Sequence, residues 1–448
     1  MNILDRIYEA GVVGCGGAGF PTHVKLNTEV EYFIVNAAEC EPLLRTDRYT
    51  MMHRAGDIIE AVDAIGDQLK ASKRVIAIKG HYHDEIACLE EAIASRNSGV
   101  KLHLLENFYP AGDEQIMVYE VTGRVIPPSG IPSAVSAVVS NVGTVAAVYD
   151  AMNGIPLTQK IITVTGEVEV PIIVSAPVGT PISEVIAQGR PIPERYTVIL
   201  GGPLMGRRIG MDDISKEFVT KTSSGVIVLD ENAHLSGRRN TSIETMLRMA
   251  RAACIQCSFC TELCTRHMLG HPLKPHKIMR KLAYNSDIEN ILEDNDVRQA
   301  LICSECGVCE EYACPMGLQP RRINKMLKTV YGQNKVRYQR EERDEWTADP
   351  AREGRKVPSK RIAARMGVDQ YYDYVIERCV ELDPASVTIS TRMHIGAPAK
   401  PVVSVGDMVK KGTLIASVGR DQMGANIHSS IDGIVTYADD SRIVIERN

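Results

Sequence analysis

Eight of the twelve cysteines stand in two short runs whose spacing suits iron–sulfur chemistry. In each run three cysteines are separated by two residues, so their thiolates can hold three iron atoms of a 4Fe-4S cube. A fourth cysteine follows each triplet, and in two-cluster ferredoxins that fourth cysteine ligates the other cluster. The spacing therefore predicts two 4Fe-4S clusters. Their expected ligands are Cys254, Cys257, Cys260 and Cys314 for one, and Cys303, Cys306, Cys309 and Cys264 for the other.

Zinc and disulfides explain these cysteines less well. Structural zinc sites use cysteine pairs but rarely place three cysteines in one CxxCxxC run. A secreted, disulfide-bonded chain would begin with an apolar signal segment, whereas Asp5, Arg6 and Glu9 interrupt the start of this one. In reducing cytosol the thiols stay free to bind metal. We therefore expect a cytoplasmic protein that moves electrons one at a time.

The composition limits the partners. The chain has 448 residues, too many for one ordinary core, so roughly three or four domains are expected. Its net charge of −5 and aromatic content of 5% give no basis for nucleic-acid binding. The most apolar stretch, residues 135–152, is interrupted by Ser140, Asn141, Gly143 and Asp150. It favours a buried α/β segment over a membrane span.

Strand-like and helix-like patterns alternate in the first third of the chain. Strands are predicted at residues 31–36, 74–78 and 101–105, and helices at residues 2–10, 57–69 and 84–94. This alternation predicts a mostly parallel sheet flanked by helices, in a domain that ends near residue 156.

The pattern changes after residue 156. Residues 159–235 hold short β runs around one helix at residues 180–188, where Ser183 is a candidate cap, and predict a small α+β module. Residues 242–331 are helical between the cysteine runs. Residues 333–360 are dense in charge and favour an exposed linker. A glycine- and valine-rich β module begins near residue 386.

A glycine-dense loop begins at Gly11, after the first predicted helix, and its residues 14–19 match the pattern GxGxxG. The dinucleotide fingerprint requires a strand before this loop and a helix after it, whereas here a helix precedes it and Phe20-Pro21 follows. The glycines would still let backbone N–H groups approach a phosphate or a flat ring, with Lys25 adding positive charge nearby. Taken alone, the loop is better explained as a structural turn.

The glycine loop does not stand alone, because it belongs to a series of four separated motifs. They are GCGGAGFPTHVK (14–25), NAAECEP (36–42), YPAGDE (109–114) and NVGT (141–144). Together they resemble the flavin-binding subunit of respiratory complex I and the C subunit of the Rnf electron-transport complex. The resemblance implies a Rossmann-like FMN- and NADH-binding domain over residues 1–156. The cofactor-binding residues that it implies are Gly14, Gly16, Gly17, Gly19, Phe20, Lys25, Asn36, Glu39, Glu41, Tyr109, Gly112, Asp113, Glu114, Asn141 and Thr144. Among these, Phe20 and Glu41 match positions that contact the nicotinamide nucleotide in the family.

The rest of the chain extends the resemblance. It implies a β-grasp ligand-binding module at residues 157–240, a helical two-cluster ferredoxin-like domain at 241–334, a charged linker at 335–385 and a barrel-sandwich (lipoyl-like) module at 386–448. The fold class is thus multidomain α/β and α+β. A barrel-sandwich at the C-terminus resembles the cobalamin reductases of propanediol-utilisation microcompartments. A lipoyl-like carrier would need a lysine at its hairpin tip, and since no lysine follows Lys411 the module is expected to be structural or a docking surface.

The implied activity is an NADH-dependent reduction of cobalamin. Electrons would pass from NADH through FMN and two 4Fe-4S clusters to cob(III)alamin and cob(II)alamin, reactivating the cofactor of a diol dehydratase. A cobalamin adenosyltransferase and shell proteins of a bacterial microcompartment would be the partners. No general acid or base is required for the electron steps. The base-off cobalamin motif DxHxxG is absent, because Thr265 stands where it needs Asp before His267.

An electron-relay protein like the Rnf C subunit is the alternative. In the family, aromatic side chains just after the lysine of the first motif and near Pro127-Pro128 bracket the adenine of NADH. This chain lacks both, with Leu26 and Asn27 following Lys25. Cys15 and Cys40 lie inside the flavin motifs, where a redox-active pair is possible, although packing is the simpler role for Cys40.

Overall fold

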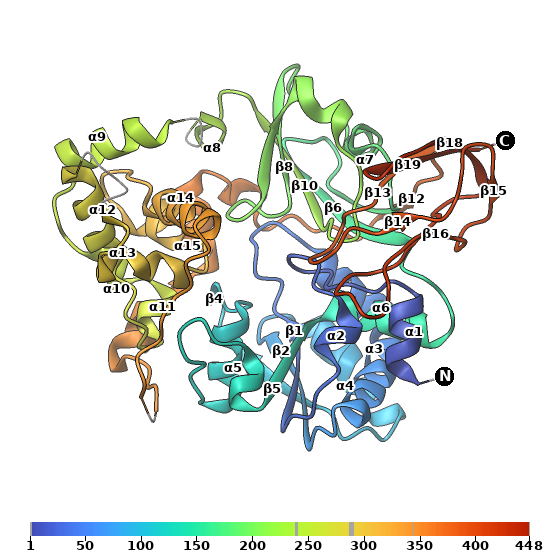
Figure 1. Cartoon of the computed structure of the whole chain (residues 1–448), viewed down its shortest axis with the longest axis horizontal. Helices are drawn as coiled ribbons and strands as arrows, with labels where there is room; N and C mark the ends of the chain where they lie inside the picture. The colour runs from blue at the N-terminus through green and yellow to red at the C-terminus, as the bar shows by residue number, and fades with distance from the viewer. Residues whose placement is uncertain (1, 238–240, 286–290, 344, 448) are drawn as a thin grey trace.

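A four-stranded parallel sheet forms the centre of the N-terminal part of the chain (Figure 1). The computed structural model describes residues 2–237, 241–285, 291–343 and 345–447. The sheet runs in the order β3-β2-β1-β5. Its strands are β1 (Tyr32–Ala37), β2 (Lys73–Lys79), β3 (Lys101–Leu105) and β5 (Ala137–Asn141). The parallel pairing expected from the alternating sequence pattern is confirmed.

Helices cover both faces of this sheet. On one face lie α1 (Ile3–Glu9), α3 (Thr46–Gln68), α4 (His83–Ser95) and α6 (Val142–Met152), and on the other lies α5 (Glu114–Thr122). Alternate residues of β1 enter the two cores, since Phe33 and Val35 pack in the first and Ile34 in the second. The helix predicted at residues 57–69 is the second half of α3, which begins eleven residues earlier.

The second part is a mixed sheet of six strands in the order β12-β7-β6-β10-β8-β9. Its strands are β6 (Gln159–Gly166), β7 (Ile172–Pro177), β8 (Tyr196–Leu200), β9 (Arg207–Gly210), β10 (Gly225–Asp230) and β12 (Cys379–Glu381). Helix α7 (Ile182–Gly189) packs on β6 and β7. The cap expected at Ser183 is wrong by two residues, because the helix begins after Pro181.

Short helices surround the cysteine runs, at the left of Figure 1. They are α9 (Ile243–Ala253), α10 (Phe259–Glu262), α11 (Thr265–Met268), α12 (Pro275–Tyr284), α13 (Asn295–Arg298) and α14 (Pro320–Gln333). A separate apolar core, which includes Ile278, Leu327 and Tyr331, holds them together. Across the described residues, every helix is too short or too polar to span a bilayer.

The charged segment after α14 is not an exposed linker throughout, contrary to the sequence expectation. Strand β11 (Val357–Pro358) pairs with β4 (Phe108–Tyr109), and α15 (Ser359–Met366) buries Ile362 in a core shared with residues from distant parts of the chain. Arg352 is 3% exposed and pairs with Glu120 of α5. Some of the interleaved charges therefore form ion pairs that hold the segment against the flavin-motif domain, the part of the chain built on the four-stranded parallel sheet.

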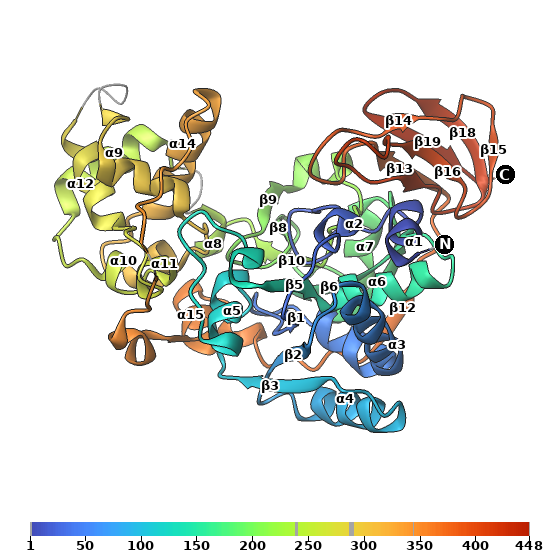
Figure 2. The same cartoon turned by 60° about the horizontal axis from the view of Figure 1, so that its bottom comes forward.

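Two small antiparallel sheets form the C-terminal module, β13-β19-β18-β15 and β14-β16-β17. The strands are β13 (Ser386–Ser390), β14 (Lys400–Pro401), β15 (Met408–Val409), β16 (Leu414–Ser417), β17 (Ile427–His428), β18 (Gly433–Ala438) and β19 (Arg442–Glu446). Figure 2 shows this module beside α1 and the short helix α2 (Thr22–Lys25). Arg420 pairs with Asp5 of α1 across the contact.

If the segment around α15 is packed as described, Ile362→Ala will destabilise the protein. Ile362 is fully buried, so the truncation removes apolar contacts and leaves a cavity, at a cost of about 2–5 kcal/mol. Arg361→Ala changes the exposed neighbour and should stay within about 0.5 kcal/mol of the parent. The thermal unfolding midpoint measures both, and equal midpoints for the two variants would mean that α15 does not pack on the remainder.

Candidate functional site

The predicted cofactor residues meet where the order of the parallel sheet reverses. From β1 the chain adds β2 and then β3 on one side, and later adds β5 on the other. Asn36 and Asn141, at the carboxyl ends of β1 and β5, are paired neighbours in the register. Such a switch point leaves a crevice beyond the strand ends and is the usual ligand site of open parallel sheets.

The glycine loop, defined as residues 11–19, lies over this crevice. The N–H of Cys15 donates to Thr144 Oγ1 at 2.8 Å, which ties the loop to the start of α6. A Cβ built on Gly16 would lie 2.8 Å from Asn141 Cγ, whereas one on Gly17 would meet nothing within 4 Å. The loop therefore touches the strand ends closely at one glycine and presents open space at the next, which fits a flat ring or phosphate against the backbone.

Asn36 faces the turn that precedes α5. Its Nδ2 donates to the carbonyl of Gly112 at 2.8 Å. A Cβ on Gly112 would lie 2.8 Å from Cys40 Cβ, so only glycine fits there. Burial raises the pKa of Cys40 to about 12, which keeps this thiol neutral and favours the packing role over the redox role.

Two carboxyls, the buried Glu39 and the half-buried Asp47, lie beside the strand ends. The N–H of Asp47 donates to Glu39 Oε2 at 2.5 Å, and Asn141 Nδ2 donates to Asp47 Oδ2 at 2.8 Å. Burial and the neighbouring Asp47 raise the pKa of Glu39 to about 8, and burial also raises the pKa of Asp47. The ammonium of Lys79 donates to the Glu39 carbonyl at 3.2 Å. This pair can retain a proton near neutral pH.

The first turn of α5 carries the acidic residues of the third motif. Asp113 caps the helix by accepting from the N–H groups of Gln115 and Ile116. It also forms two hydrogen bonds, of 2.7 and 2.9 Å, with the guanidinium of Arg266. Glu114 pairs with Lys25 at 2.7 Å, and both side chains stay partly exposed. The predicted Lys25 and Glu114 are thus partners of each other.

Tyr109 and Glu41 connect the flavin motifs to the other parts of the chain. The hydroxyl of Tyr109 donates to the carbonyl of Cys306 at 2.8 Å, inside the second cysteine run. Glu41 accepts hydrogen bonds from the N–H groups of Leu204 and Met205, at 2.9 and 3.0 Å. Its nucleotide contact, implied by the family resemblance, stays a prediction. Phe20, the other such position, is half-buried at the end of the glycine loop.

The eight cysteines gather in the two crossed sets. Burial, followed by the thiols of Cys314, Cys254 and Cys257, raises the pKa of Cys260 to about 12. Burial, followed by Cys303 and Cys306, raises the pKa of Cys264. Burial, followed by Glu310 and then by Cys303, Cys306 and Cys264, raises the pKa of Cys309. Thiols influence one another in this way only at short range, so each fourth cysteine lies with the other run.

Among the residues that the structure describes, no three His, Cys, Asp or Glu side chains gather closely enough for a single metal ion. A 4Fe-4S cube would bind its four thiolates on separate iron atoms. A cavity lined by Cys254, Cys257, Cys260 and Cys314 lies at the first set.

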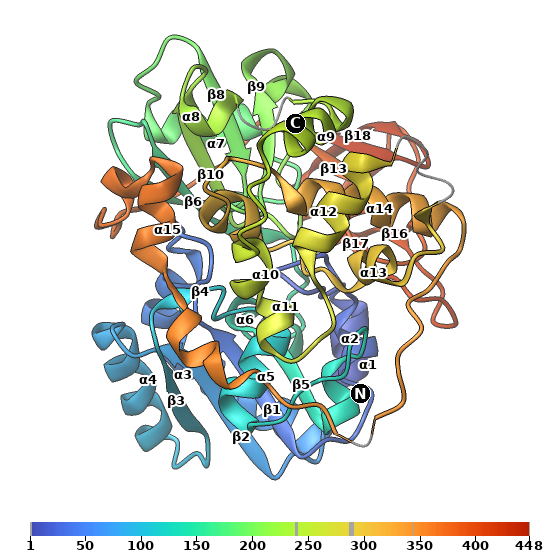
Figure 3. The same cartoon turned by 90° about the vertical axis from the view of Figure 1, so that its left-hand side faces the viewer.

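The two sets differ in exposure. Cys257 of the first set is exposed, and Ile255 and Phe259 beside it are 62% and 53% exposed. In the second set Cys309 is buried and the Cys306 carbonyl accepts from Tyr109 of the flavin motifs. Figure 3 shows α10 and α11, which follow parts of the first run, above α5 of the flavin-motif domain. The second set is therefore the inner one and the first set the outer one.

Several residues of the site were not foreseen from the sequence. Asp47 is the acid that pairs with Glu39, and Lys79 donates to the Glu39 carbonyl. Arg266 forms the ion pair with Asp113. Arg321 pairs with Glu310 and donates to the carbonyl of Leu204. Arg266 could have been flagged, since it stands two residues after Cys264, but the other contacts are long-range and leave no local pattern.

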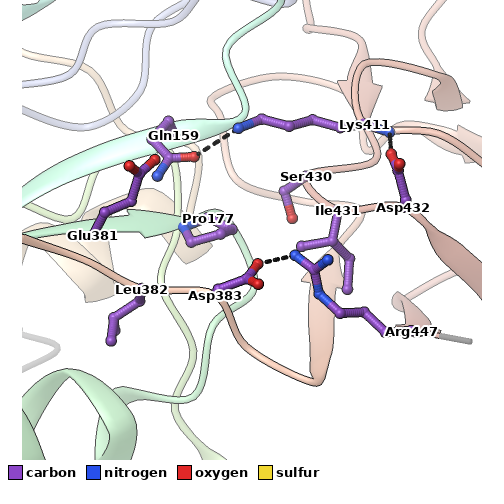
Figure 4. Close-up of a pocket in the computed structure, with 10 residues that line it drawn as sticks. All are labelled: Gln159, Pro177, Glu381, Leu382, Asp383, Lys411, Ser430, Ile431, Asp432 and Arg447. Atoms are coloured by element: carbon purple, nitrogen blue, oxygen red, sulfur yellow. Dashed lines mark hydrogen bonds and ion pairs between the residues drawn. The ribbon is translucent and has the colours of Figure 1, made fainter.

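A hollow of about 430 Å³ lies elsewhere, between the six-stranded sheet and the C-terminal module (Figure 4). Its charged groups are largely paired: Lys411 Nζ lies 3.2 Å from Gln159 Oε1, and Arg447 pairs with Asp383. None of the residues predicted for the flavin or the clusters lines it.

Comparison with protein families gives three matches along the chain. The Nuo51 FMN-binding domain matches residues 7–150, the 4Fe-4S dicluster domain matches residues 253–319, and the RnfC barrel sandwich hybrid domain matches residues 377–447. Together with the two cysteine sets, these matches define a flavin and iron–sulfur oxidoreductase.

Curated relatives narrow the class. The chain is 40% identical over 453 residues to cobalamin reductase PduS of Salmonella typhimurium, covering 100% of this chain and 96% of the relative. It is 38% identical over 449 residues to cobalamin reductase PduS of Citrobacter freundii, covering 100% and 97%. The chain belongs to the cobalamin reductase family.

More distant likenesses cover less. The C subunit of the proton-translocating ferredoxin:NAD(+) oxidoreductase complex of Clostridium ljungdahlii is 34% identical over 276 residues, which is 60% of this chain and 56% of the relative. Crystal structures of an NAD+-reducing nickel–iron hydrogenase, in the H2-reduced and air-oxidised states, share 20% identity and have TM-scores of 0.49 and 0.47. They align with 75% and 83% of this chain, over 62% and 67% of their own. At these TM-scores we base no argument on them.

Replacing Glu39 by Gln should flatten the dependence of stability on pH. In the unfolded chain Glu39 loses its proton near its ordinary pKa of 4.5, whereas the folded chain keeps it until about pH 8. The unfolded state therefore binds fewer protons between these values, and the wild type loses stability as the pH rises through them. Glu39→Gln carries no charge, so at pH 8.5 it should be more stable than the parent by at least about 1 kcal/mol.

Thermal unfolding midpoints from pH 6 to pH 9, without added FMN, measure this difference. Glu90→Gln, on the exposed side of α4, is the matched control and should follow the wild type. Parallel pH curves for wild type and Glu39→Gln would show that the buried pair does not hold the proton.

Proposed function

We propose that this chain transfers electrons from NADH through FMN and two 4Fe-4S clusters to cobalamin. The observation that carries the proposal is the hydrogen bond from Tyr109 to the Cys306 carbonyl, which joins the flavin motifs to the inner cysteine set. NADH and cob(III)alamin would give NAD+, a proton and cob(I)alamin, so that one hydride supplies both electrons. FMN, when bound, accepts an electron pair and releases electrons singly, as clusters require.

The flavin pocket would be formed by the glycine loop and the strand ends. Gly14, Gly16 and Gly17 would lie against the flavin, with Lys25 near its polar groups. Asn36, Glu39 and Asn141 would hydrogen-bond the isoalloxazine, ribityl or phosphate groups. The open space at Gly17 and the close approach of Gly16 to Asn141 support this assignment. The remaining predicted members are Gly19, Phe20, Glu41, Tyr109, Gly112, Asp113, Glu114 and Thr144.

The ligand sets would be the crossed ones. The inner cluster would use Cys303, Cys306, Cys309 and Cys264, and the outer cluster Cys254, Cys257, Cys260 and Cys314. The inner set adjoins the flavin motifs, while the outer set has the exposed Cys257. Electrons would thus arrive at the inner set and leave from the outer one. The apolar rim of Ile255 and Phe259 would meet the acceptor there.

The cellular context is proposed from the family resemblance of the sequence. The acceptor would be cob(III)alamin or cob(II)alamin, delivered with the help of a cobalamin adenosyltransferase, and the product would reactivate a diol dehydratase. The protein would reside in the cytoplasm within a bacterial microcompartment, in contact with shell proteins. An Rnf-type relay is less well supported, because the relative from the proton-translocating complex aligns with 60% of this chain and the cobalamin reductases with 100%.

We divide the chain at the boundaries given by the sequence. Residues 1–156 would be a Rossmann-like flavin domain, 157–240 a β-grasp module, 241–334 a ferredoxin-like domain, and 386–448 a lipoyl-like barrel-sandwich. Five of the six strands of the mixed sheet lie within the second of these ranges, together with α7, which supports a compact module there. Residues 335–385 would connect the last two while packing on the first two, since β11 pairs with β4 of the first and β12 joins the sheet of the second.

An anaerobic assay tests the reaction. Cluster-replete protein with FMN should convert the absorption spectrum of aquacobalamin while one NADH is consumed per two electrons. Free FMN with NADH, at the same concentrations and without protein, measures the background. Bleaching of the flavin with no change in cobalamin would mean a different acceptor, and absence of bleaching would exclude NADH as the donor.

Serine variants test the order of the two cysteine sets. Cys306→Ser should prevent NADH from reducing either cluster, because it damages the set beside the flavin. Cys257→Ser should leave the inner cluster reducible, yet both variants should lower cobalamin reduction about a hundredfold or more. Electron paramagnetic resonance after NADH addition separates the two cases.

Cys88→Ser, in α4 and outside both sets, is the matched control and should behave as the wild type. If Cys257→Ser abolished reduction of both clusters while Cys306→Ser left one reducible, the proposed order would be reversed.

A further inference from the structure

The C-terminal module contacts both ends of the glycine loop. At the first end, a Cβ built on Gly11 would lie 2.1 Å from the carbonyl oxygen of Asn426. At the other end, the N–H of Ile395 donates to the carbonyl of Gly19 at 3.1 Å. Both glycines have left-handed φ, +65° and +73°, so a side chain at either position would be strained as well as crowded. Figures 1 and 2 both show the module beside α1 and α2, which flank the loop.

Lys221 joins the loop to the module. This residue precedes β10 in the six-stranded sheet and is 1% exposed. Its ammonium donates to the carbonyl of Gly11 at 2.7 Å and to the carbonyl of Asn426 at 2.6 Å. Three parts of the chain therefore meet at one buried amine. Burial lowers the pKa of Lys221 to about 7, and the Cys15 thiol opposes this effect.

The tip of the loop contrasts with its ends. Gly16, Gly17 and Ala18 are exposed, whereas Gly11 and Gly19 are buried. A glycine-rich segment loses much conformational entropy when a ligand orders it. Fixing its two ends beforehand reduces that loss, because fewer conformations remain to be excluded on binding. The arrangement thus suits a loop whose ends are held while its tip receives a ligand.

We propose that the C-terminal module clamps the glycine loop in its FMN-binding conformation, with Lys221 as the positioning residue that joins the two. This inference rests on the flavin site proposed above. It assigns to a lipoyl-like module a fixed role at the flavin, in place of carrying a group. Tyr8 supports the same contact, since its hydroxyl donates to the carbonyl of Val418 and its own carbonyl accepts from Asn426 Nδ2.

Lys221→Met tests the proposal in the full-length, cluster-replete protein. Methionine keeps most of the side-chain length and volume but removes both hydrogen bonds to the carbonyls. The dissociation constant for FMN, measured by quenching of flavin fluorescence, should rise about tenfold or more. The visible circular dichroism of bound FMN should also change, while the cluster signals in electron paramagnetic resonance stay as in the wild type.

Lys216→Met is the matched control. Lys216 lies five residues before Lys221, in the part of the chain built on the six-stranded sheet. Its side chain is largely exposed and pairs with Asp213, so its loss should leave FMN binding unchanged. Should Lys221→Met fail to fold, Tyr8→Phe removes one hydrogen bond of the same contact without touching a buried charge. That variant should weaken FMN binding about twofold or more. Unchanged FMN affinity and circular dichroism in the folded Lys221→Met protein, or in Tyr8→Phe if it replaces that variant, would overturn the proposal.

A third variant separates this inference from the flavin site itself. Gly17→Leu fills the open space at the loop tip and should abolish FMN binding if the flavin lies there. Loss of binding in Gly17→Leu with wild-type binding in Lys221→Met would overturn only the clamp. Wild-type FMN binding in Gly17→Leu would overturn the proposed flavin site and the clamp with it.

Discussion

The ion pair between Arg266 and Asp113 fixes the relation between the two halves of the electron path. Asp113 caps α5 at the flavin motifs, and Arg266 stands two residues after Cys264 of the inner set. Both side chains are largely buried, so removing either partner would leave a charge without compensation, at a cost of roughly 3–5 kcal/mol. Burial acts to lower the pKa of Arg266, but Asp113 outweighs it and raises the pKa overall. The cap, the cysteine and the ion pair therefore form one unit.

The second module is held in place by the same region. Glu41 of the flavin motifs accepts from the N–H groups of Leu204 and Met205, and Arg321 donates to the carbonyl of Leu204 from the opposite side. Because Arg321 also pairs with Glu310, next to Cys309, the turn around Leu204 contacts both the flavin motifs and the inner cysteine set. Each contact uses a charged group on backbone atoms, which fixes position more strictly than apolar packing does.

Much of the site could be predicted, because its strongest signals are local. The spacing of the cysteines predicts which triplet would bind each cluster, and the crossed fourth ligands are proposed from how such runs fold in two-cluster ferredoxins. The parallel sheet also followed from its pattern. The contact of Asn36 with Asn141, however, needs the strand order, which places residues 105 positions apart in adjacent strands. Asp47 and Lys221 were not found, because a buried charge is marked by its surroundings and those come from distant segments.

The charged segment shows why composition alone misled. Interleaved acids and bases at residues 333–360 are typical of a solvated linker, yet Arg352 and Lys356 face Glu120 of α5. Because the neighbouring domain carries the opposite charge, the segment is held against it by ion pairs. The apolar Ile362, which follows in the chain, packs in a buried core.

The C-terminal module is held by contacts on two sides, which a mobile carrier domain would lack. A carrier domain must travel, so its contacts with the body have to be few and its lysine free. Here Lys411, in the turn between β15 and β16, lies 3.2 Å from Gln159 Oε1, and its N–H donates to Asp432. The module also places the Asn426 carbonyl against the ammonium of Lys221 and forms an ion pair with α1. Contacts on both sides of the module hold it in one position, and a barrel-sandwich held in this way can contribute only where it stands, at the base of the glycine loop.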